Sequence, residues 1–373
     1  MSRENLNVPY VNLAAQHAPL KERLLAAIGE VIDHSQFILG DEVAEFERRF
    51  ADLCGVRYAV GVNSGTDALF FALKALGVGP GDEVITVPNS FISSTGCIAL
   101  LGARPVFVDV GDDYNIDPDL VEPAITAHTR AILPVHLTGR PARMAPLVEI
   151  ARSHGLPIVE DCAQAVSAEY REQPVGSFGA VGCFSLHPLK TLSGCGDGGV
   201  LTTNDAGLYE DLKQLRNIGL RTRDECVVWS HNSRLDTLQA AILLVKLDWL
   251  EEWTEKRQSN ACFYQRLLDG VPQVQAPVDR PNERAVYHTF VIQADDRDGL
   301  KAHLAAHGIG AAIHYPVPIH LQKAAAGLGY SRGSFPVTER QADRILSLPV
   351  YPELGATELE YVAATLRAFY EGA

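Results

Sequence analysis

Hydrophobic residues follow two different periods along this chain, and the changes of period predict the order of its secondary structure. Residues 40–55, GDEVAEFERRFADLCG, have the period of a helix with one buried face. We expect Asp41 to cap the start of this helix and Gly55 to end it. Its apolar positions recur at spacings of three and four: Val43, Phe46, Phe50 and Leu53.

Beyond residue 56, short apolar runs of strand type alternate with helical segments. This alternation predicts βαβ units, and therefore a mostly parallel sheet covered by helices on both faces. Two further apolar runs, 180–186 and 198–204, are too close together for a helical crossover, so we expect the sheet to turn antiparallel there. The other predicted strands are 57–62, 82–88, 104–110, 129–137 and 156–161, with helices at 67–77, 91–102 and 144–155.

The last third of the chain has a different pattern. One long helix is predicted from Asp236 to about Leu268, followed by strand, helix, strand and helix at 287–294, 297–308, 309–316 and 358–372. We therefore predict an α/β fold with a large domain at 1–245 and a smaller α+β domain at 246–373. The N-terminal segment 1–35 is expected to pack on the small domain.

Composition narrows the class of protein. The chain has 373 residues and a net charge of -14, which disfavours a nucleic acid or an anionic membrane as its partner. Its seven cysteines form no CxxC pair, which argues against a disulfide framework and a zinc ribbon. The N-terminus is polar and carries Glu4, unlike a signal peptide, and no apolar run reaches the roughly 20 residues of a membrane span. We expect a cytoplasmic protein.

Two segments with candidate chemistry follow predicted strands, where ligands bind in open α/β sheets. In GVNSGTDAL, residues 61–69, Gly65 and Thr66 open a helix whose free N–H groups could hold a phosphate, although a capped helix without a ligand has the same pattern. In IVEDCAQA, residues 158–165, Asp161 could pair with a protonated pyridine nitrogen, and Gln164 could bond a ring substituent. A helix cap or a structural ion pair would explain Asp161 equally well.

The third segment is FSLHPLKTLSGCGDGGVLTT, residues 184–203. Lys190 lies between an apolar run and a run of glycines that would allow unusual φ angles and a close backbone approach, as a Schiff-base lysine beside a flat cofactor requires. Ser185 could bind the same phosphate as Thr66. The letters GCGDGG match the dinucleotide fingerprint, but they lead into a strand rather than a helix, so we reject that interpretation. The three segments together favour pyridoxal 5′-phosphate (PLP).

A metal site is not predicted. His303 and His307 lie at helical spacing in HLAAH, but a zincin glutamate and a third ligand are missing from the pattern. A solvated helix face explains this pair better.

Seven blocks of the sequence, in order, resemble those of the DegT-type (DegT/DnrJ/StrS) sugar aminotransferases, which are fold-type I PLP enzymes. The resemblance runs nearly from end to end. The blocks are FILGDEVAEFERRFA, GVNSGTDAL, GDEVITVPNSFISS, PVHLTGRPARM, VEDCAQA, FSLHPLKTLSGCGDGG and HNSRLDTLQAAI.

The resemblance implies a role for individual residues. Lys190 would form the Schiff base and move the proton, Asp161 would hold the pyridine nitrogen protonated, and Gln164 would contact the ring hydroxyl. Gly65, Thr66 and Ser185 would bind the phosphate, and Phe91 would stack on the ring. Asn232 would reach the phosphate in a neighbouring subunit, which implies a homodimer with shared sites. The segment AIHYPVPIH would supply substrate contacts from His314, Tyr315 and His320.

The implied activity is amino transfer from an amino acid, with L-glutamate expected, to a keto-sugar that is expected to be nucleotide-linked. The cofactor would cycle between PLP and its aminated form, PMP. Three alternatives stay open: a keto-inositol type cyclitol aminotransferase with glutamine as donor, a PLP-dependent sugar dehydratase, and a non-catalytic PLP-binding regulator. One relative of this family became a dehydratase when histidine replaced its lysine, so the presence of Lys190 favours transamination.

Overall fold

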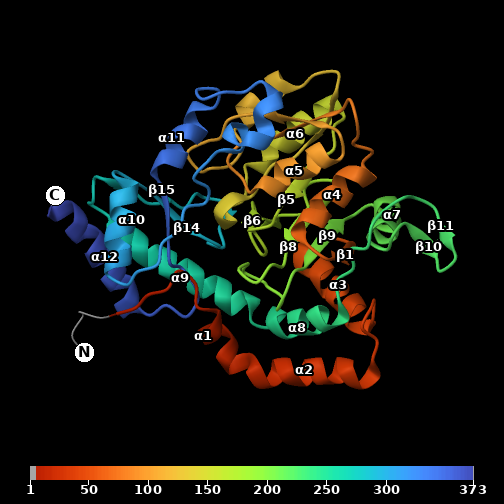
Figure 1. Ribbon diagram of the computed structural model, residues 1–373, viewed down its shortest axis with the longest axis horizontal. Helices are drawn as coiled ribbons and strands as arrows, with labels where there is room; N and C mark the ends of the chain where they lie inside the picture. Colours follow the sequence, from red (N-terminus) through yellow and green to blue (C-terminus); the bar gives the residue numbers. More distant parts are fainter. Residues whose placement is uncertain (1–5, 373) are drawn as a thin grey trace.

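The computed structural model describes residues 6–372 and is built around one mixed β-sheet (Figure 1). Parallel bridges from Ile132 to Ile158 and from Val135 to Asp161 join two groups of strands into the order β1-β9-β8-β5-β4-β2-β3. Strand β9 is antiparallel to both neighbours, and the other pairs are parallel, as predicted. The strands are β1 (Tyr58–Val62), β2 (Glu83–Thr86), β3 (Arg104–Phe107), β4 (Thr129–Ile132), β5 (Val159–Asp161), β8 (Val181–Ser185) and β9 (Gly199–Thr203).

Helices cover both faces of this sheet. On β8, Cys183 belongs to one hydrophobic core and its neighbour Phe184 to another, because successive side chains of a strand point to opposite faces. The first core is covered by α4 (Gly65–Ala75), α5 (Ile92–Leu100), α6 (Met144–His154) and α7 (Ala206–Arg216). The second is covered by α3 (Asp41–Cys54) and α8 (Thr237–Leu247).

Helix α3 confirms the predicted buried face, and its start corrects one detail. Phe46 and Phe50 are fully buried, and Phe50 packs edge-on against Phe184 with ring centroids 4.9 Å apart. Gly55 ends the helix in a left-handed conformation, as predicted. Asp41 is not the cap, because the extended residue before the helix is Gly40 and Asp41 already lies in the first turn. There its carboxylate still faces the positive end of the helix dipole.

The long helix predicted from Asp236 to Leu268 is broken into α8 and α9 (Leu250–Leu268). At the corner the N–H of Trp249 bonds the carbonyl of Lys246, three residues back, in place of the residue four back. Asp248 stabilises this corner from outside, because its carboxylate accepts from Arg23 at 2.7 Å and from Arg49 at 3.0 Å. The break lets α8 cover the central sheet while α9 runs to the C-terminal region (Figure 1).

The C-terminal region has its own sheet and core, beside the central sheet (Figure 1). Strand order is β12-β14-β15, all antiparallel, with α10 and α12 packed beside it. The strand predicted at 309–316 is wrong: only Ile309 and Ala312 form isolated bridges, and β15 takes the place beside β14. The elements are β12 (Val274–Gln275), β14 (Phe290–Ala294), α10 (Arg297–Ala306), α11 (Pro336–Arg344), β15 (Ile345–Leu348) and α12 (Ala356–Glu371).

The N-terminal segment contacts both regions. Val8 forms a parallel bridge with Ile309 in the C-terminal region, whereas Leu20 and Leu24 pack against Ile242 and Trp253 of α8 and α9. A domain boundary near residue 245 would fall inside α8 and stays a prediction. The remaining elements are α1 (Leu13–His17), α2 (Lys21–His34), β6 (Glu169–Tyr170), β7 (Gln173–Pro174), β10 (Leu220–Thr222), β11 (Glu225–Cys226), β13 (Glu283–Arg284) and short 3-10 turns. Between residues 6 and 372, we find no helix that is both long and apolar enough to cross a bilayer.

The glycines after Lys190 serve close packing, as expected, but not unusual backbone angles. Neither Gly194 nor Gly199 has a positive φ, so the expected left-handed conformations are wrong for both. A Cβ added to Gly199 would lie 2.3 Å from the carbonyl oxygen of Ser64, and one added to Gly194 would lie 2.7 Å from Oε1 of Gln239. Glycine at 199 therefore lets β9 approach the start of α4 closely.

Substitution of Gly199 by alanine should lower the free energy of unfolding by about 3 kcal/mol, because backbone atoms on both sides must move apart. Urea denaturation of wild type and Gly199→Ala measures this difference. Gly96→Ala on α5 is the matched control: a Cβ there meets nothing within 4 Å, so we expect a gain of about 0.5–1 kcal/mol. Equal stability of the two variants would contradict the packing argument.

Candidate active site

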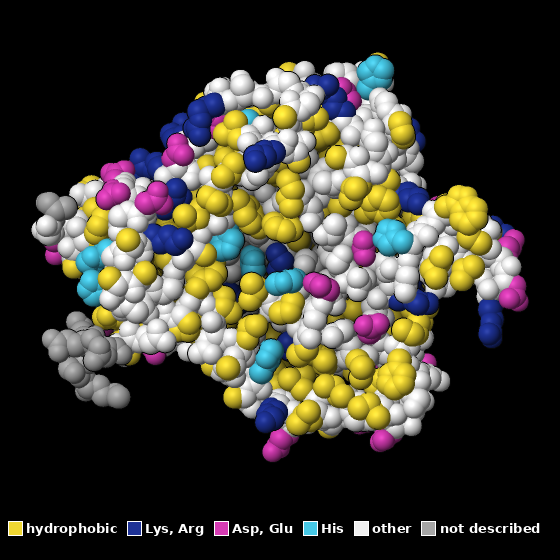
Figure 2. Space-filling view, in the orientation of Figure 1, with side chains coloured by type: hydrophobic (Ala, Val, Ile, Leu, Met, Phe, Trp, Pro, Cys, Tyr) yellow, Lys and Arg dark blue, Asp and Glu magenta, His cyan; other side chains and the backbone are white. Residues whose placement is uncertain are grey.

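A cavity of about 440 Å³ lies at the carboxyl ends of the central strands and contains Lys190 and Asp161. Figure 2 shows it as a hollow near the middle of this face, with histidine side chains around it. Residues from the start of α4, from the loops after β5 and β8, and from 288–289 and 314–315 line it. The structure thus brings the three sequence segments with candidate chemistry into one cavity.

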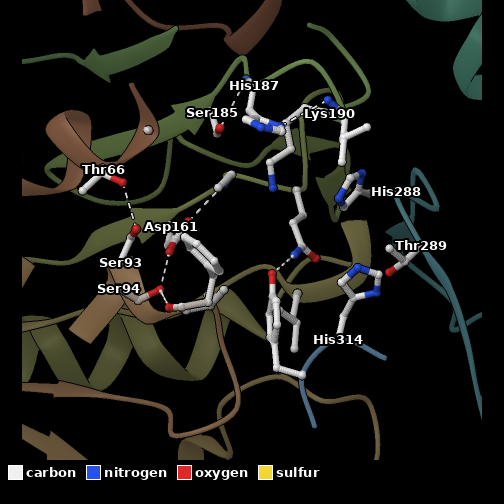
Figure 3. A pocket seen from close by; sticks show the side chains of 18 of the residues that line it. Thr66, Ser93, Ser94, Asp161, Ser185, His187, Lys190, His288, Thr289 and His314 are labelled. Carbon is white, nitrogen blue, oxygen red and sulfur yellow. Dashed lines mark hydrogen bonds between the residues drawn. The ribbon is translucent and has the colours of Figure 1, made fainter. Parts of the chain in front are cut away.

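One end of the cavity is the N-terminus of α4. Ser64 caps this helix, with its hydroxyl accepting from the N–H of Asp67 at 3.0 Å. Gly65 packs closely on β8, because a Cβ at this position would lie 2.7 Å from Cβ of Ser185. The hydroxyl of Thr66 is 2.8 Å from that of Ser93 (Figure 3). Free N–H groups and several hydroxyls at a helix N-terminus form an anion site.

Asp161, the last residue of β5, is buried in the wall of the cavity. Its carboxylate accepts hydrogen bonds from the hydroxyl of Ser94 at 2.7 Å and from the N–H of Ala163 at 3.1 Å. Burial nevertheless raises the pKa of this carboxyl above its ordinary value, against the opposing effects of both hydrogen bonds and of Lys190. A cation placed beside Asp161 would therefore be strongly favoured.

The neighbouring acid, Glu160, points to the other side of β5 and has a structural role. Its carboxylate accepts from the N–H groups of Gly176, Phe178 and Gly179 at 2.8–2.9 Å. His136 bonds it from Nε2 at 3.1 Å, while Nδ1 accepts from an amide. Although His136, Glu160 and Cys162 have ligand-type atoms within 4.8 Å of one another, hydrogen bonds already occupy these groups. We assign them to packing.

Lys190 extends into the cavity between its two ends (Figure 3). Burial lowers the pKa of its amine from 10.5 to about 8, with the negative charge of Asp161 acting in the opposite direction. Near neutral pH a useful fraction of the amine is therefore uncharged and nucleophilic. Lys190 forms no ion pair with Asp161 in the described chain, so both groups face the space between them.

Several other predicted residues also face this space. Gln164 accepts from the N–H of Thr138 at 2.7 Å and donates to the hydroxyl of Tyr315 at 3.4 Å. Phe91 lies against Tyr315, with ring centroids 5.7 Å apart. His314 bonds the hydroxyl of Ser347 through Nδ1 at 2.9 Å, and burial together with Lys190 lowers its pKa. Its imidazole is thus neutral near pH 7.

Two predicted residues lie outside the cavity. His320 is buried against Phe335, and its Nε2 is 2.9 Å from a carboxylate oxygen of Glu339. The structure therefore does not bring His320 to the predicted substrate contacts. Its bond to Glu339 holds the imidazole ring outside the cavity. Asn232 is exposed and bridges to Asn217.

The sequence interpretation missed other cavity residues. Ser94 bonds Asp161, and Tyr10, Arg257, His288 and Thr289 also line the cavity. Figure 3 shows His288 and Thr289 across Lys190 from Thr66 and Ser93. No signal marked His288 and Thr289, because the predicted strand 287–294 includes both of them. Arg257 lies in the middle of a helix, where sequence pattern gives no such signal.

These residues fit PLP. The N-terminus of α4 suits its phosphate, and the tight contact of Gly65 with Ser185 brings a further hydroxyl to the same place. Asp161 suits a protonated ring nitrogen, and the amine of Lys190 lies in the same cavity. The fit rests on three chemically different groups that come from distant parts of the chain.

The pH dependence of Lys190 is testable through its reactivity. Labelling of this lysine by an amine-reactive reagent, followed by mass spectrometry, should rise through a midpoint near pH 8, because the neutral amine forms as pH rises. Asp161→Asn removes the charge that raises the pKa, so the midpoint should move below 8. Labelling of the exposed Lys256 serves as the internal control and should be unaffected. An Asp161→Asn midpoint above that of wild type would contradict the assignment.

Three curated relatives are similar to this chain over almost its whole length. The dTDP-3-amino-3,4,6-trideoxy-alpha-D-glucose transaminase of Streptomyces venezuelae is 44% identical over 99% of this chain and 97% of its own. The UDP-N-acetyl-3-dehydro-alpha-D-glucosamine 3-aminotransferase of Acidithiobacillus ferrooxidans is 43% identical over 99% and 100%. A pleiotropic regulatory protein of Geobacillus stearothermophilus is 42% identical over 98% and 99%.

Solved structures agree with this likeness. DesV of S. venezuelae, crystallised with a ketimine intermediate, is 44% identical with a TM-score of 0.96 over 98% of this chain and 99% of its own. NtdA of Bacillus subtilis, which contains PMP, is 28% identical with a TM-score of 0.92 over 99% and 86%. The family model for the DegT/DnrJ/EryC1/StrS aminotransferases matches residues 19–367. The chain belongs to this family and is a PLP-dependent aminotransferase.

Proposed function

We propose that this enzyme transfers an amino group from L-glutamate to the ketone of a nucleotide-linked sugar. The observation that carries the proposal is the presence of Lys190 and Asp161 in one cavity beside the anion site at the start of α4. Those groups are what amino transfer with PLP requires. The names of two relatives, both of which act on nucleotide sugars, support the choice of acceptor.

PLP supplies a reactive aldehyde and an electron sink when bound. Lys190 would take the proton from the carbon that loses nitrogen and return one to the carbon that gains it. Asp161 would keep the ring nitrogen protonated through its buried carboxylate, which Ser94 holds in place. Gly65, Thr66 and Ser185 would hold the phosphate, and Phe91 would contact the ring. Gln164 would contact the ring hydroxyl.

The acceptor enters from the side of His314 and Tyr315. Both relatives with sugar substrates are named for nitrogen or a keto group at carbon 3, which supports carbon 3 as the aminated position. Tyr315 is suited to donate a hydrogen bond, because its hydroxyl accepts from Gln164 and its own proton is left to donate.

We further propose a cytoplasmic homodimer. The segment that follows β11 exposes Val227, Val228 and Trp229, the last with 87% of its surface accessible. This arm projects from the body of the molecule, and apolar side chains are visible on it (Figures 1 and 2). An apolar projection is typical of a subunit contact. Asn232, close by in sequence, would reach the partner's phosphate site. The free cysteines, seven in the described chain, support a reducing compartment.

A regulatory role is the second candidate, and the name of the Geobacillus relative is the observation that favours it. It would use the same cofactor site as the aminotransferase activity.

Purified protein reconstituted with PLP should be yellow and should lose this colour when L-glutamate is added, as the cofactor becomes aminated. The visible absorption spectrum measures both changes. Lys190→Ala should bind the cofactor but lose at least about 10³-fold in the rate of bleaching, because proton transfer has lost its base. Colour that ignores glutamate would favour another donor, the dehydratase or the regulator. Substantial amino transfer by Lys190→Ala would remove the mechanism.

Shared sites predict complementation between two inactive variants. Lys190→Ala and Asn232→Ala should each be strongly impaired as homodimers. Mixed dimers, formed after denaturation and refolding together, should regain activity, because one of their two sites has both residues intact. The paired control is Lys190→Ala refolded with Asp161→Asn, which should regain activity only if those residues came from different subunits. Failure of the first mixture to recover would contradict a contribution of Asn232 across the interface.

A further inference from the structure

Arg257 is a buried cation whose guanidinium lines the active-site cavity. It belongs to α9 and is only 7% exposed. Its Nη1 has two long contacts, with the carbonyls of Tyr287 at 3.4 Å and His288 at 3.5 Å. Its Nε has no hydrogen-bond partner in the described chain. The negative charge of Glu353 acts on the guanidinium, but the two groups form no ion pair among residues 6–372. Burial of a guanidinium with so few hydrogen bonds lowers the stability of the folded protein unless a ligand supplies the missing hydrogen bonds.

Two neighbours in the cavity wall are also incompletely bonded. The hydroxyl of Thr289, which is 4% exposed, and Nδ1 of His288 have no partner among the residues that the structure describes. Thus Arg257, His288 and Thr289 each have a polar atom that can still form a hydrogen bond with a ligand. Hydrogen-bond donors around a guanidinium are the chemistry that binds a carboxylate.

This end lies within reach of Lys190. Arg257, His288 and Lys190 line the same cavity, and Nη1 of Arg257 is 3.5 Å from the carbonyl of His288. Burial lowers the pKa of His288, and the positive charges of Lys190 and Arg257 lower it further. The cation itself persists at neutral pH, since burial lowers the pKa of Arg257 only to about 10. Figure 3 shows His288 and Thr289 on the side of Lys190 away from Thr66, and hence away from the site assigned to the cofactor phosphate.

We propose that Arg257, assisted by Thr289, binds the α-carboxylate of the amino donor. This inference rests on the proposed function and adds a determinant of donor specificity. In an amino acid the α-carboxylate is bonded to the carbon that bears the nitrogen, so it must lie near Lys190 during transfer. The phosphates of a sugar nucleotide lie beyond the sugar ring from the reacting carbon. They therefore belong toward the mouth of the cavity, away from a deeply buried arginine.

The test compares three amines on wild type and Arg257→Met, with the single-turnover loss of the yellow colour as the measurement. L-Glutamate and L-2-aminobutyrate retain the α-carboxylate, whereas 4-aminobutyrate is glutamate without it. We expect the concentration of the first two for half-maximal rate to rise on the order of 10- to 100-fold, since bonds to a charged group are lost. The reaction of 4-aminobutyrate should change little. Thr289→Val should show a smaller effect of the same pattern.

A binding measurement removes the dependence on turnover. Calorimetric titration of the PLP-loaded enzyme with glutarate should show binding to wild type and at least a 10-fold weaker affinity in Arg257→Met. Arg257→Lys keeps the charge and should be intermediate, which separates this role from a failure to fold. Lys256→Met, an exposed charge on the same helix, is the control and should bind glutarate like wild type.

Three results would overturn the proposal. They are an equal loss for all three amines, a loss for glutamate and 4-aminobutyrate that spares L-2-aminobutyrate, and unchanged glutarate affinity in Arg257→Met. The second result would place Arg257 on the γ-carboxylate, which glutamate and 4-aminobutyrate share and L-2-aminobutyrate lacks. If wild type fails to convert glutamate but glutarate binding still depends on Arg257, the proposed donor reaction fails and the carboxylate site stands.

Discussion

The burial of two opposite charges in one cavity is the constraint on which this active site depends. Asp161 and Lys190 both lie in surroundings that disfavour their charged forms, and each partly offsets the effect of burial on the other. They share a cavity without a direct ion pair in the described chain, so the field of each acts on whatever lies between them. A low dielectric strengthens such fields. The lysine can therefore be reactive near neutral pH, and the buried aspartate favours a positive charge beside it.

The sheet is what keeps these charges in place. Asp161 ends β5, and its backbone bonds to Pro134 and His136 join the two halves of the central sheet. Across the cavity, Ser185 ends β8 and packs against Gly65. Asp161 and Ser185 are thus held at strand ends by backbone hydrogen bonds, whereas Lys190 lies on the loop after β8, where its N–H bonds the carbonyl of His187. Small side chains at the contacts let these strand ends and the start of α4 approach closely.

Sequence pattern was sufficient for the regular part of the fold. Strands β1 to β5, β8 and β9 follow from apolar runs, and the three segments with Thr66, Asp161 and Lys190 meet in one cavity, although their roles toward the cofactor stay predictions. The break between α8 and α9 was not predictable, because it depends on Asp248 meeting Arg23 and Arg49 from distant segments. The helical spacing of apolar residues continues through this break without a change. Likewise His320 has the residue type of a substrate contact, but Glu339 binds it elsewhere. Long-range pairs of this kind leave no local signature.

The adjacent acids of β5 have a consequence for how this protein can change during evolution. Glu160 and Asp161 point to opposite faces of the sheet. Glu160 accepts from the backbone N–H groups of Gly176 and Phe178, and Asp161 faces the cavity. A gain or loss of one residue within β5 would exchange the two faces. The shorter acid would then meet amides placed for the longer one, and the longer acid would crowd the cavity. Lineages of this enzyme can therefore vary in length in their surface loops, whereas the length of this strand is fixed by its chemistry.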